Sequence, residues 1–329
     1  MSDISRSITS VPKIKFAGFE IPKWIFFSML TIILYGLMGL FAKFASNTIS
    51  PLLVQVISTF GMAPILVVLL FSKNIKKVHG KIGLGVFFSV LVGLLSSLGA
   101  ICQYFSFSKG GLASVVVPIG SLASLVTVIL ARFVFKDKLN RFQLVGVVLS
   151  IIAILMFNIT LDGTGTENTS VPLFKSLTSS WMLFALLGLF SAGTAQLFIK
   201  AGTNHISADL LTIIVLAVTL ALSVVFIFTQ SFSWEMSSKD FWACLIVGIL
   251  GSAAFLTQAA AYSSGIASLV APLCSLFPVV TVIFAAPILG EKLTLLIIGA
   301  VIISSIAAIA ISIEKTPEIA LPENIDVTN

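Results

Sequence analysis

Long apolar runs separated by short polar segments dominate this 329-residue chain. A helix needs about 20 apolar residues to cross a bilayer, and we assign ten such runs. They are roughly Trp24–Phe44, Pro51–Phe71, Ile82–Tyr104, Leu112–Phe135, Phe142–Ile159, Trp181–Ile199, Ala208–Phe228, Phe241–Tyr262, Ala267–Leu289 and Thr294–Ile313. An isolated strand cannot satisfy its backbone in lipid, and these runs are about twice as long as barrel strands. The pattern therefore predicts an all-α polytopic membrane protein with ten transmembrane helices.

The chain also contains one segment twice. Residues Gly111–Ile129 match Gly265–Ile283 without gaps at a constant offset of 154 residues, and Leu40–Ser50 match Leu197–Ser207 at an offset of 157. Both copies are apolar, which is typical of a membrane protein built from structural repeats. Five spans per copy is an odd number, so the second copy must enter the membrane from the opposite side. We therefore expect an inverted 5+5 repeat with a site where the halves meet.

The repeat divides the chain into five parts. They are a cytoplasmic N-terminal segment (1–23), the first repeat with spans 1–5 (24–160), an extracytoplasmic linker (161–180), the second repeat with spans 6–10 (181–313) and a disordered cytoplasmic tail (314–329). The linker is rich in Gly, Ser, Thr and Asn, and the tail contains two prolines and four acidic residues, as loops and disordered segments do.

Composition and charge support this assignment and orient it. Hydrophobic residues make up 58% of the chain and charged residues 10%, and the net charge is +6. With the N-terminus inside, fourteen of the nineteen Lys and Arg residues fall in cytoplasmic segments, so the positive-inside rule places both termini in the cytoplasm. The basic run Lys73–Lys81 is better explained as a loop beside anionic lipid than as a nucleic-acid site. The expected partners are the bilayer and a small-molecule substrate, and nothing in the sequence indicates an oligomeric state.

The sequence offers no catalytic chemistry. Cys102, Cys244 and Cys274 are scattered within spans and lack zinc-ligand spacing. We find no Walker loop, dinucleotide fingerprint or Ser-His-Asp arrangement, so we predict no catalytic residue, metal or cofactor, and no enzyme activity. All thirteen acidic residues fall in loops, tails or span ends. Coupling would therefore use another group, use Na⁺ held by carbonyls at a broken helix, or be absent.

Two lysines, Lys43 and Lys200, occupy matched positions at span ends. Their long stems allow the ammonium groups to snorkel to the interface, which suffices to explain them. The alternative is that they attract or gate anionic substrates. Each shares a helical face with a glycine one to two turns earlier, Gly36 and Gly193.

A stripe of small residues opens the fourth span and recurs in the ninth. Its members are Gly111, Ser114, Pro118 and Ser121, and then Gly265, Ser268, Pro272 and Ser275. Small residues allow close helix packing, which is one explanation. In the other, Pro118 and Pro272 kink their helices and free carbonyls near mid-membrane, and the serines line a polar cavity.

Further polar residues could complete such a cavity. The candidates are Tyr35 on the first span, Ser96, Gln103 and Tyr104 on the third, Gln196 on the sixth, and Thr257, Gln258 and Tyr262 on the eighth. Buried amides cost several kcal/mol in a membrane unless they are partnered, so the glutamines must bind a neighbour or a substrate.

With its inverted 5+5 duplication, its G-x-A-S-x-V-x-P stripe and its charged turn LGEKL (Leu289–Leu293), the chain resembles the EamA type of the drug/metabolite transporter superfamily over Trp24–Ile313. The first copy departs from that turn by carrying KDKL (Lys136–Leu139). The resemblance implies carriage of a small polar metabolite, such as an amino acid or a sugar, by alternating access and often outward.

Our leading hypothesis is therefore a transporter of small solutes in a plasma membrane, expected to be a bacterial inner membrane, and acting as an exporter. The alternatives are a lipid flippase, a membrane-embedded transferase and a receptor. A transferase would need paired intramembrane carboxylates or a metal set, and a flippase would need a lateral groove open to lipid. An inverted duplication has no evident use in a receptor.

Overall fold

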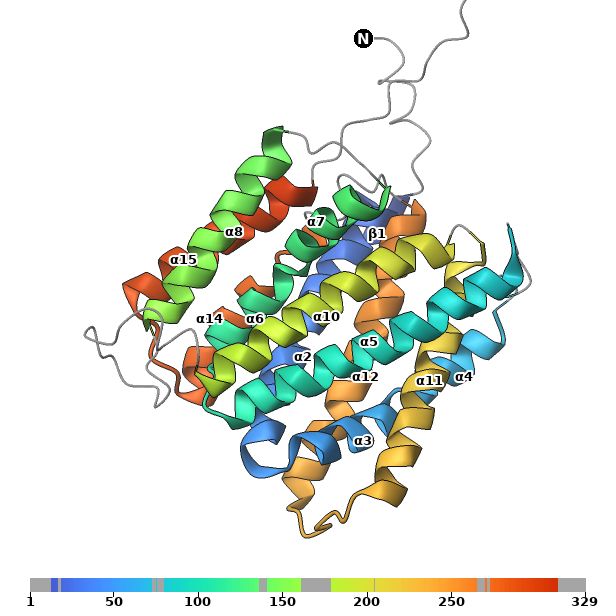
Figure 1. Cartoon of the computed structure of the whole chain (residues 1–329), viewed down its shortest axis with the longest axis horizontal. Helices are drawn as coiled ribbons and strands as arrows, with labels where there is room; N and C mark the ends of the chain where they lie inside the picture. The colour runs from blue at the N-terminus through green and yellow to red at the C-terminus, as the bar shows by residue number, and fades with distance from the viewer. Residues whose placement is uncertain are drawn as a thin grey trace, which may run out of the picture.

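The computed structural model describes residues 13–16, 19–72, 75, 80–135, 141–160, 179–203, 205–264, 270 and 273–312. Its helices are α2 (Lys23–Thr48), α3 (Pro51–Gly61), α4 (Ala63–Leu70), α5 (Ile82–Ser108), α6 (Ala113–Ser121), α7 (Ala123–Phe135), α8 (Arg141–Thr160), α10 (Ser180–Thr203), α11 (Ala208–Thr229), α12 (Ser238–Ser264), α14 (Phe277–Leu289) and α15 (Leu295–Ser312). The helices lie in one bundle, with α8 and α15 paired at one edge and α3, α4 and α11 at the other (Figure 1).

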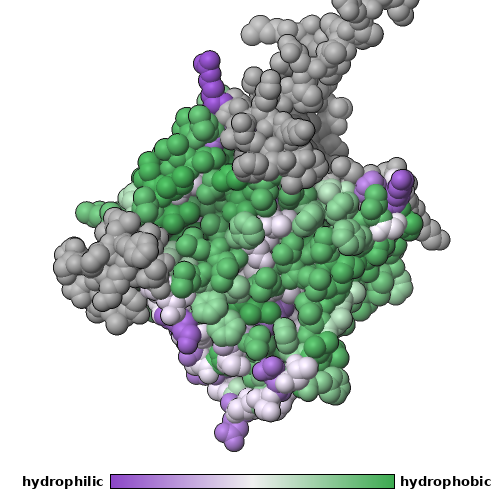
Figure 2. Space-filling model, viewed as in Figure 1, coloured by the Kyte–Doolittle hydropathy of each residue, from purple (hydrophilic) through white to green (hydrophobic). Residues whose placement is uncertain are grey.

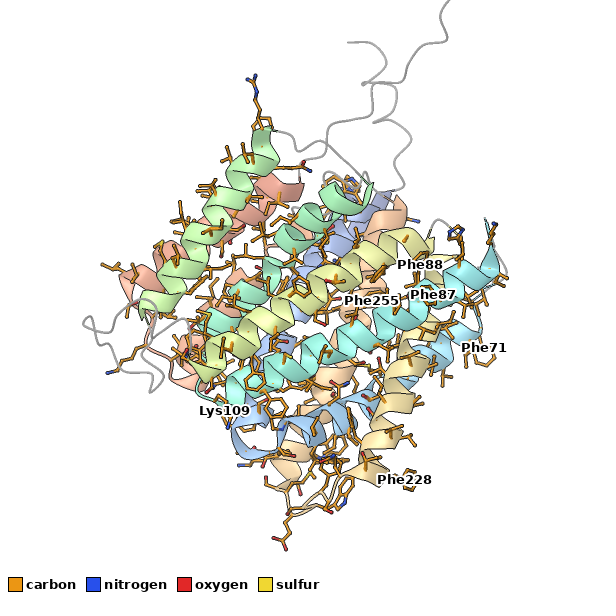
Figure 3. The ribbon with its side chains drawn as sticks, viewed as in Figure 1. Phe71, Phe87, Phe88, Lys109, Phe228 and Phe255 are labelled. Carbon is orange, nitrogen blue, oxygen red and sulfur yellow. The ribbon has the colours of Figure 1, made fainter. Side chains whose placement is uncertain are left out.

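The surface of this bundle is suited to lipid. Figure 2 shows a mostly hydrophobic face, with hydrophilic residues gathered toward the ends of the helices. In Figure 3, Phe71 and Phe228 point away from the bundle, and they are 84% and 85% exposed. In the described ranges, six helices are long and apolar enough to cross a membrane, and four shorter apolar helices accompany them. A polytopic helical membrane protein is thus confirmed, whereas ten spans stay a prediction.

One part of the N-terminal segment is not helical. Strands β1 (Lys13–Phe16) and β2 (Phe19–Pro22) pair antiparallel directly before α2. The segments KIKF and FEIP alternate polar and apolar residues, the period of a strand. The long apolar runs predict helices alone, so this short hairpin was not predicted.

Three predicted continuous spans are interrupted within the described residues, the ninth by a turn at 275–276 directly before α14. The second divides into α3 and α4 at Met62, because Pro64 has no N–H for the carbonyl one turn earlier. The fourth divides into α6 and α7 at Leu122. There the Ser121 hydroxyl donates to the Pro118 carbonyl at 2.8 Å, so the Leu122 N–H turns to Ile119 instead. A serine competing for a helical carbonyl therefore ends α6.

The two halves pack on each other through equivalent pairs of helices. The most extensive contacts join α10 to α5 and α12 to α2, so the first span of each half lies against the third span of the other. Another large contact joins α8 to α15, the last span of each half. Residues far apart in sequence therefore lie side by side throughout the bundle.

One contact illustrates this reciprocity atom by atom. The Thr281 hydroxyl donates to the Gly36 carbonyl at 2.9 Å, and the Thr127 hydroxyl donates to the Gly193 carbonyl at 2.8 Å. The threonines are 154 residues apart and the glycines 157, the offsets of the sequence repeat. The same interaction is thus made twice, once by each half toward the other.

Neighbouring side chains follow the same rule. A Cβ at Gly36 would come within 2.5 Å of Val280, and one at Gly193 would come within 2.5 Å of Val126, the residue equivalent to Val280. Glycine is needed at both places because the backbones of the crossing helices approach closely.

Candidate functional site

A strip of polar side chains joins α2 to α12. The Thr31 and Thr257 hydroxyls lie 2.9 Å apart, and the Tyr35 hydroxyl donates to Gln258 Oε1 at 3.4 Å. Thr31 and Tyr35 are one helical turn apart and therefore lie on the same face of α2. The structure thus brings together three predicted site residues, Tyr35, Thr257 and Gln258.

Sequence reasoning missed the fourth member, Thr31. It is fully buried, whereas Tyr35, Thr257 and Gln258 are half-buried. The signal was its spacing of four residues from Tyr35, which was itself a candidate. The Tyr35 ring also lies at 5.6 Å from the Phe277 ring on α14, so the strip adjoins the start of that helix.

Residues on α5 are divided between two environments. Ser96 and Gln103 are half-buried on α5, which packs mainly against α10. Tyr104 is 3% exposed and lies near Ser58 on α3. Tyr104 therefore belongs to the interior of the first half.

The stripe that opens the fourth span lies inside the protein. Ser114 is fully buried, and its hydroxyl has no hydrogen-bond partner among the described residues. Pro118 is also buried within α6, and Ser121 is half-buried where α6 ends. Ser275 occupies the equivalent turn before α14 and is likewise half-buried.

The other candidates are placed less closely together or are not described. Gln196 is exposed, and its Oε1 lies 3.3 Å from the Thr127 hydroxyl oxygen. Ser268 and Pro272 lie outside the described residues. Tyr262 and Lys200 lie on α12 and α10, but their side chains are outside the description.

A buried pair of charges lies at the far end of α2. Lys43 is 7% exposed, and its ammonium donates to the Phe107 carbonyl at 3.1 Å and lies 5.9 Å from the Phe107 ring centre. Lys43 thus binds within the protein and does not snorkel to an exposed interface. The nearby Glu291 carboxylate acts on this ammonium electrostatically.

Glu291 connects the second half to the first. Its carboxylate, in a residue that is 8% exposed, accepts the Ala113 N–H at 2.6 Å and the Ser114 N–H at 2.9 Å. A carboxylate at this position satisfies two orphan donors of α6 and interacts favourably with the helix dipole. The turn that delivers it uses Gly290 with a φ of 69°, a conformation that favours glycine. We name Lys43, Phe107, Ala113, Ser114 and Glu291 the charged cluster.

Sequence reasoning placed Glu291 in the charged turn LGEKL and gave it no individual role. The available signal was the pairing of two motifs, the GEKL turn of one half and the small-residue helix start of the other. Only the fold brings them into contact. Within the described ranges, no three His, Cys, Asp or Glu side chains come together as a possible metal site.

Comparison with known proteins agrees with the duplication. The profile of the EamA-like transporter family matches residues 22–159 and again residues 179–313. An uncharacterized protein of Methanocaldococcus jannaschii is 31% identical over 137 residues, covering 41% of this chain and 96% of that protein. An uncharacterized transporter in the cobO 3' region of a Sinorhizobium species is 32% identical over 124 residues, covering 36% of this chain and 87% of that protein.

A solved crystal structure has a similar fold. It superposes with a TM-score of 0.57 at 14% sequence identity and covers 87% of this chain and 94% of the other. At this identity the similarity concerns the fold alone.

Proposed function

Because this chain belongs to the EamA-like transporter family, it is a membrane transporter, and we propose that it carries a small polar metabolite by alternating access between two inverted repeats. The metabolite would be an amino acid, a sugar or a related compound, and the direction would be export. The protein would act as a secondary transporter in a plasma membrane.

The reciprocal contacts between the halves carry this proposal. Interactions made twice between equivalent positions, such as Thr281 with Gly36 and Thr127 with Gly193, are what a pseudo-two-fold axis between two copies produces. The six long and four shorter apolar helices would give five spans per half. An odd number of spans would place this axis in the membrane plane, the arrangement of transporters that rock one repeat against the other.

The strip on α2 and α12 is our candidate for substrate contacts. Its members are a phenol, a primary amide and two hydroxyls, which both donate and accept hydrogen bonds and carry no charge. The Tyr35–Gln258 bond is long at 3.4 Å, so a substrate that replaces it would forfeit little. These groups suit a neutral or zwitterionic polar solute better than a strongly charged one.

The charged cluster would form the outer seal of such a carrier. It joins the ends of α2, α5 and α6 to the turn after α14, and in the proposed topology all of these lie on the extracytoplasmic side. Alternating access requires this end to open in one state. Opening would separate Glu291 from α6, because the two belong to different halves.

A groove between α14 and α15 raises lipid transport as a second candidate. It has a volume of about 440 Å³ and is lined by aliphatic side chains such as Val279, Ile302 and Ile306. It meets the requirement for a lateral surface that a lipid tail could occupy. However, Ser305 is the one polar residue in its lining, so a lipid headgroup would find no polar path across the membrane. The metabolite carrier is therefore the better proposal.

Two experiments test the function. Growth of an overexpressing strain across toxic amino acids, their analogues and sugars should reveal resistance to one class, and purified protein in liposomes should then carry that compound. The Gln258→Ala variant, measured in both assays, tests whether the strip contacts the substrate. Resistance that is unchanged in this variant would reject the assigned strip, and flux of labelled lipid with no solute flux would favour the flippase.

The proposed orientation has its own test. Cysteines introduced singly at Ser2 and Asn329, in a background without Cys102, Cys244 and Cys274, should resist impermeant thiol reagents in intact cells. A cysteine at a residue of the 161–180 linker should react. The opposite pattern would place the termini outside.

A further inference from the structure

A second group of polar side chains is buried away from the strip, among α3, α5 and α11. Gln55, Ser58 and Thr59 lie on α3, Tyr104 on α5 and Ser223 on α11, and each is at most 3% exposed. We call these five residues the hydroxyl cluster. Buried polar groups are nearly always hydrogen-bonded, so we identify the partner of each proton and each lone pair in this cluster.

The hydroxyl protons of the cluster are already committed. Ser58 and Thr59 both donate to the Gln55 backbone carbonyl, at 3.0 and 2.8 Å, and Ser223 donates to the Thr59 hydroxyl at 2.9 Å. The Tyr104 side chain lies near Ser58. Among the described residues, Ser58 and Ser223 therefore keep acceptor lone pairs, whereas Thr59 already accepts from both Ser223 and Gln55 Nε2.

The Gln55 side chain has a buried oxygen that lacks a hydrogen-bond donor among the described residues. Its Nε2 donates to the Thr59 hydroxyl at 3.3 Å, which fixes the orientation of the amide. Its Oε1 is buried and receives no hydrogen bond from any described residue. An unpaired buried amide oxygen is costly, so this oxygen is suited to bind a species that coordinates oxygen.

The chemistry of the cluster points to a monovalent cation. All of its side-chain ligands are neutral oxygens, whereas divalent cations are usually held by carboxylates.

The backbone is also broken close to the cluster in sequence. The break between α3 and α4 at Met62 follows Thr59 by less than one turn, and Pro64 leaves a carbonyl without its helical donor. Broken helices supply carbonyl ligands for Na⁺ in other transporter folds. On the opposite side, Gly248 of α12 packs directly on the Ser58 carbonyl, which brings a fourth helix to the cluster.

We propose that the hydroxyl cluster binds a sodium ion, with Gln55 Oε1 as a direct ligand. Binding would tie α3 and α11 to the turn of α5 that carries Tyr104. This site is separate from the strip on α2 and α12. It goes beyond the proposed carriage of a metabolite, because ion binding can be measured with no substrate present.

The test compares thermal unfolding of the purified protein in NaCl, KCl and choline chloride at equal ionic strength. The wild-type midpoint should rise with NaCl concentration in a saturable way, because a ligand that binds only the folded state stabilises it. The Gln55→Leu variant should lose this rise. In choline chloride the variant should be at least as stable as wild type, since the substitution removes an unpaired buried oxygen.

Ser150→Ala is the matched control. Ser150 is also fully buried in a helix, and its hydroxyl donates to the Gly146 carbonyl on α8, away from the cluster. This variant should keep the full response to Na⁺. A wild-type midpoint equal in all three salts, or a Gln55→Leu variant that responds as wild type does, would overturn the proposal and leave a buried water as the occupant. Neither result would bear on metabolite transport.

Discussion

Replacing Glu291 should destabilise the protein more than replacing any exposed carboxylate. Its two oxygens accept the N–H groups of Ala113 and Ser114, and it is 8% exposed. Glu291→Ala leaves two buried N–H groups unpaired, at about 1–3 kcal/mol each. It also leaves the buried Lys43 ammonium without the nearby negative charge. We therefore expect a total loss of roughly 2–6 kcal/mol.

Glu291→Gln separates the hydrogen bonds from the charge. The amide keeps one acceptor oxygen, so one N–H of α6 stays paired and the other faces an NH₂ group. Hydrogen bonds to charged groups contribute about 1.5–3 kcal/mol and neutral ones about 0.5–1.5 kcal/mol. The Gln variant should therefore lie between wild type and Ala.

Reversible unfolding in mixed detergent micelles, with denaturant at fixed pH, would measure these differences. Glu235→Ala is the matched control, because Glu235 is exposed in the loop between α11 and α12 and should change stability by less than about 0.5 kcal/mol. A Glu291→Ala variant within that same range of wild type would refute the reasoning. So would a Gln variant less stable than the Ala variant.

Two further predictions concern the strip and the helix crossing. Tyr35→Phe and Gln258→Ala should each lower transport of the identified substrate at least about tenfold, because a lost polar contact of 1.4 kcal/mol is a tenfold effect. The unfolding midpoint should stay near wild type. A midpoint that falls together with the flux would show that these residues serve packing and not substrate binding. Gly36→Ala should destabilise the protein by about 1–3 kcal/mol, because the new methyl group overpacks against Val280. Gly83→Ala is the control and should be neutral or slightly stabilising, since no atom lies within 4 Å of its new methyl group. Equal stabilities of the two variants in a thermal assay would contradict the close helix crossing.

The proposed Na⁺ site and the Lys43–Glu291 pair have different consequences for the coupling of transport to an ion gradient. The sequence places no carboxylate at mid-membrane, and the structure places Glu291 at the end of a helix, where it holds α6. Its hydrogen bonds explain its burial without a proton relay. If Na⁺ stabilises the protein through Gln55, the natural next measurement is substrate flux with and without a sodium gradient.

Much of the architecture follows from local and periodic features of the sequence. Apolar runs long enough to cross a bilayer must be helical because lipid offers no other backbone partners. The repeated segment, at offsets of 154 and 157 residues, predicted two equivalent halves, and the family profile matches the chain twice. Tyr35, Thr257 and Gln258 could be proposed because polar side chains are costly in apolar spans and so stand out.

Long-range contacts decided the rest. The sequence does not show that Gln258 meets Tyr35 while Tyr104 turns into α3, because the face a helix presents to each neighbour depends on how the helices cross. The break at Leu122 depends on the Ser121 hydroxyl, which donates to the Pro118 carbonyl in place of the helical N–H. A hydropathy pattern does not predict such a hydrogen bond. Glu291 reads as a solvated turn residue until the fold brings the start of α6, 177 residues away from it, within hydrogen-bond distance. Hydrophobic length is a property of each segment, but burial of a charge is a property of the assembled bundle, and so only the tertiary structure could reveal the charged cluster.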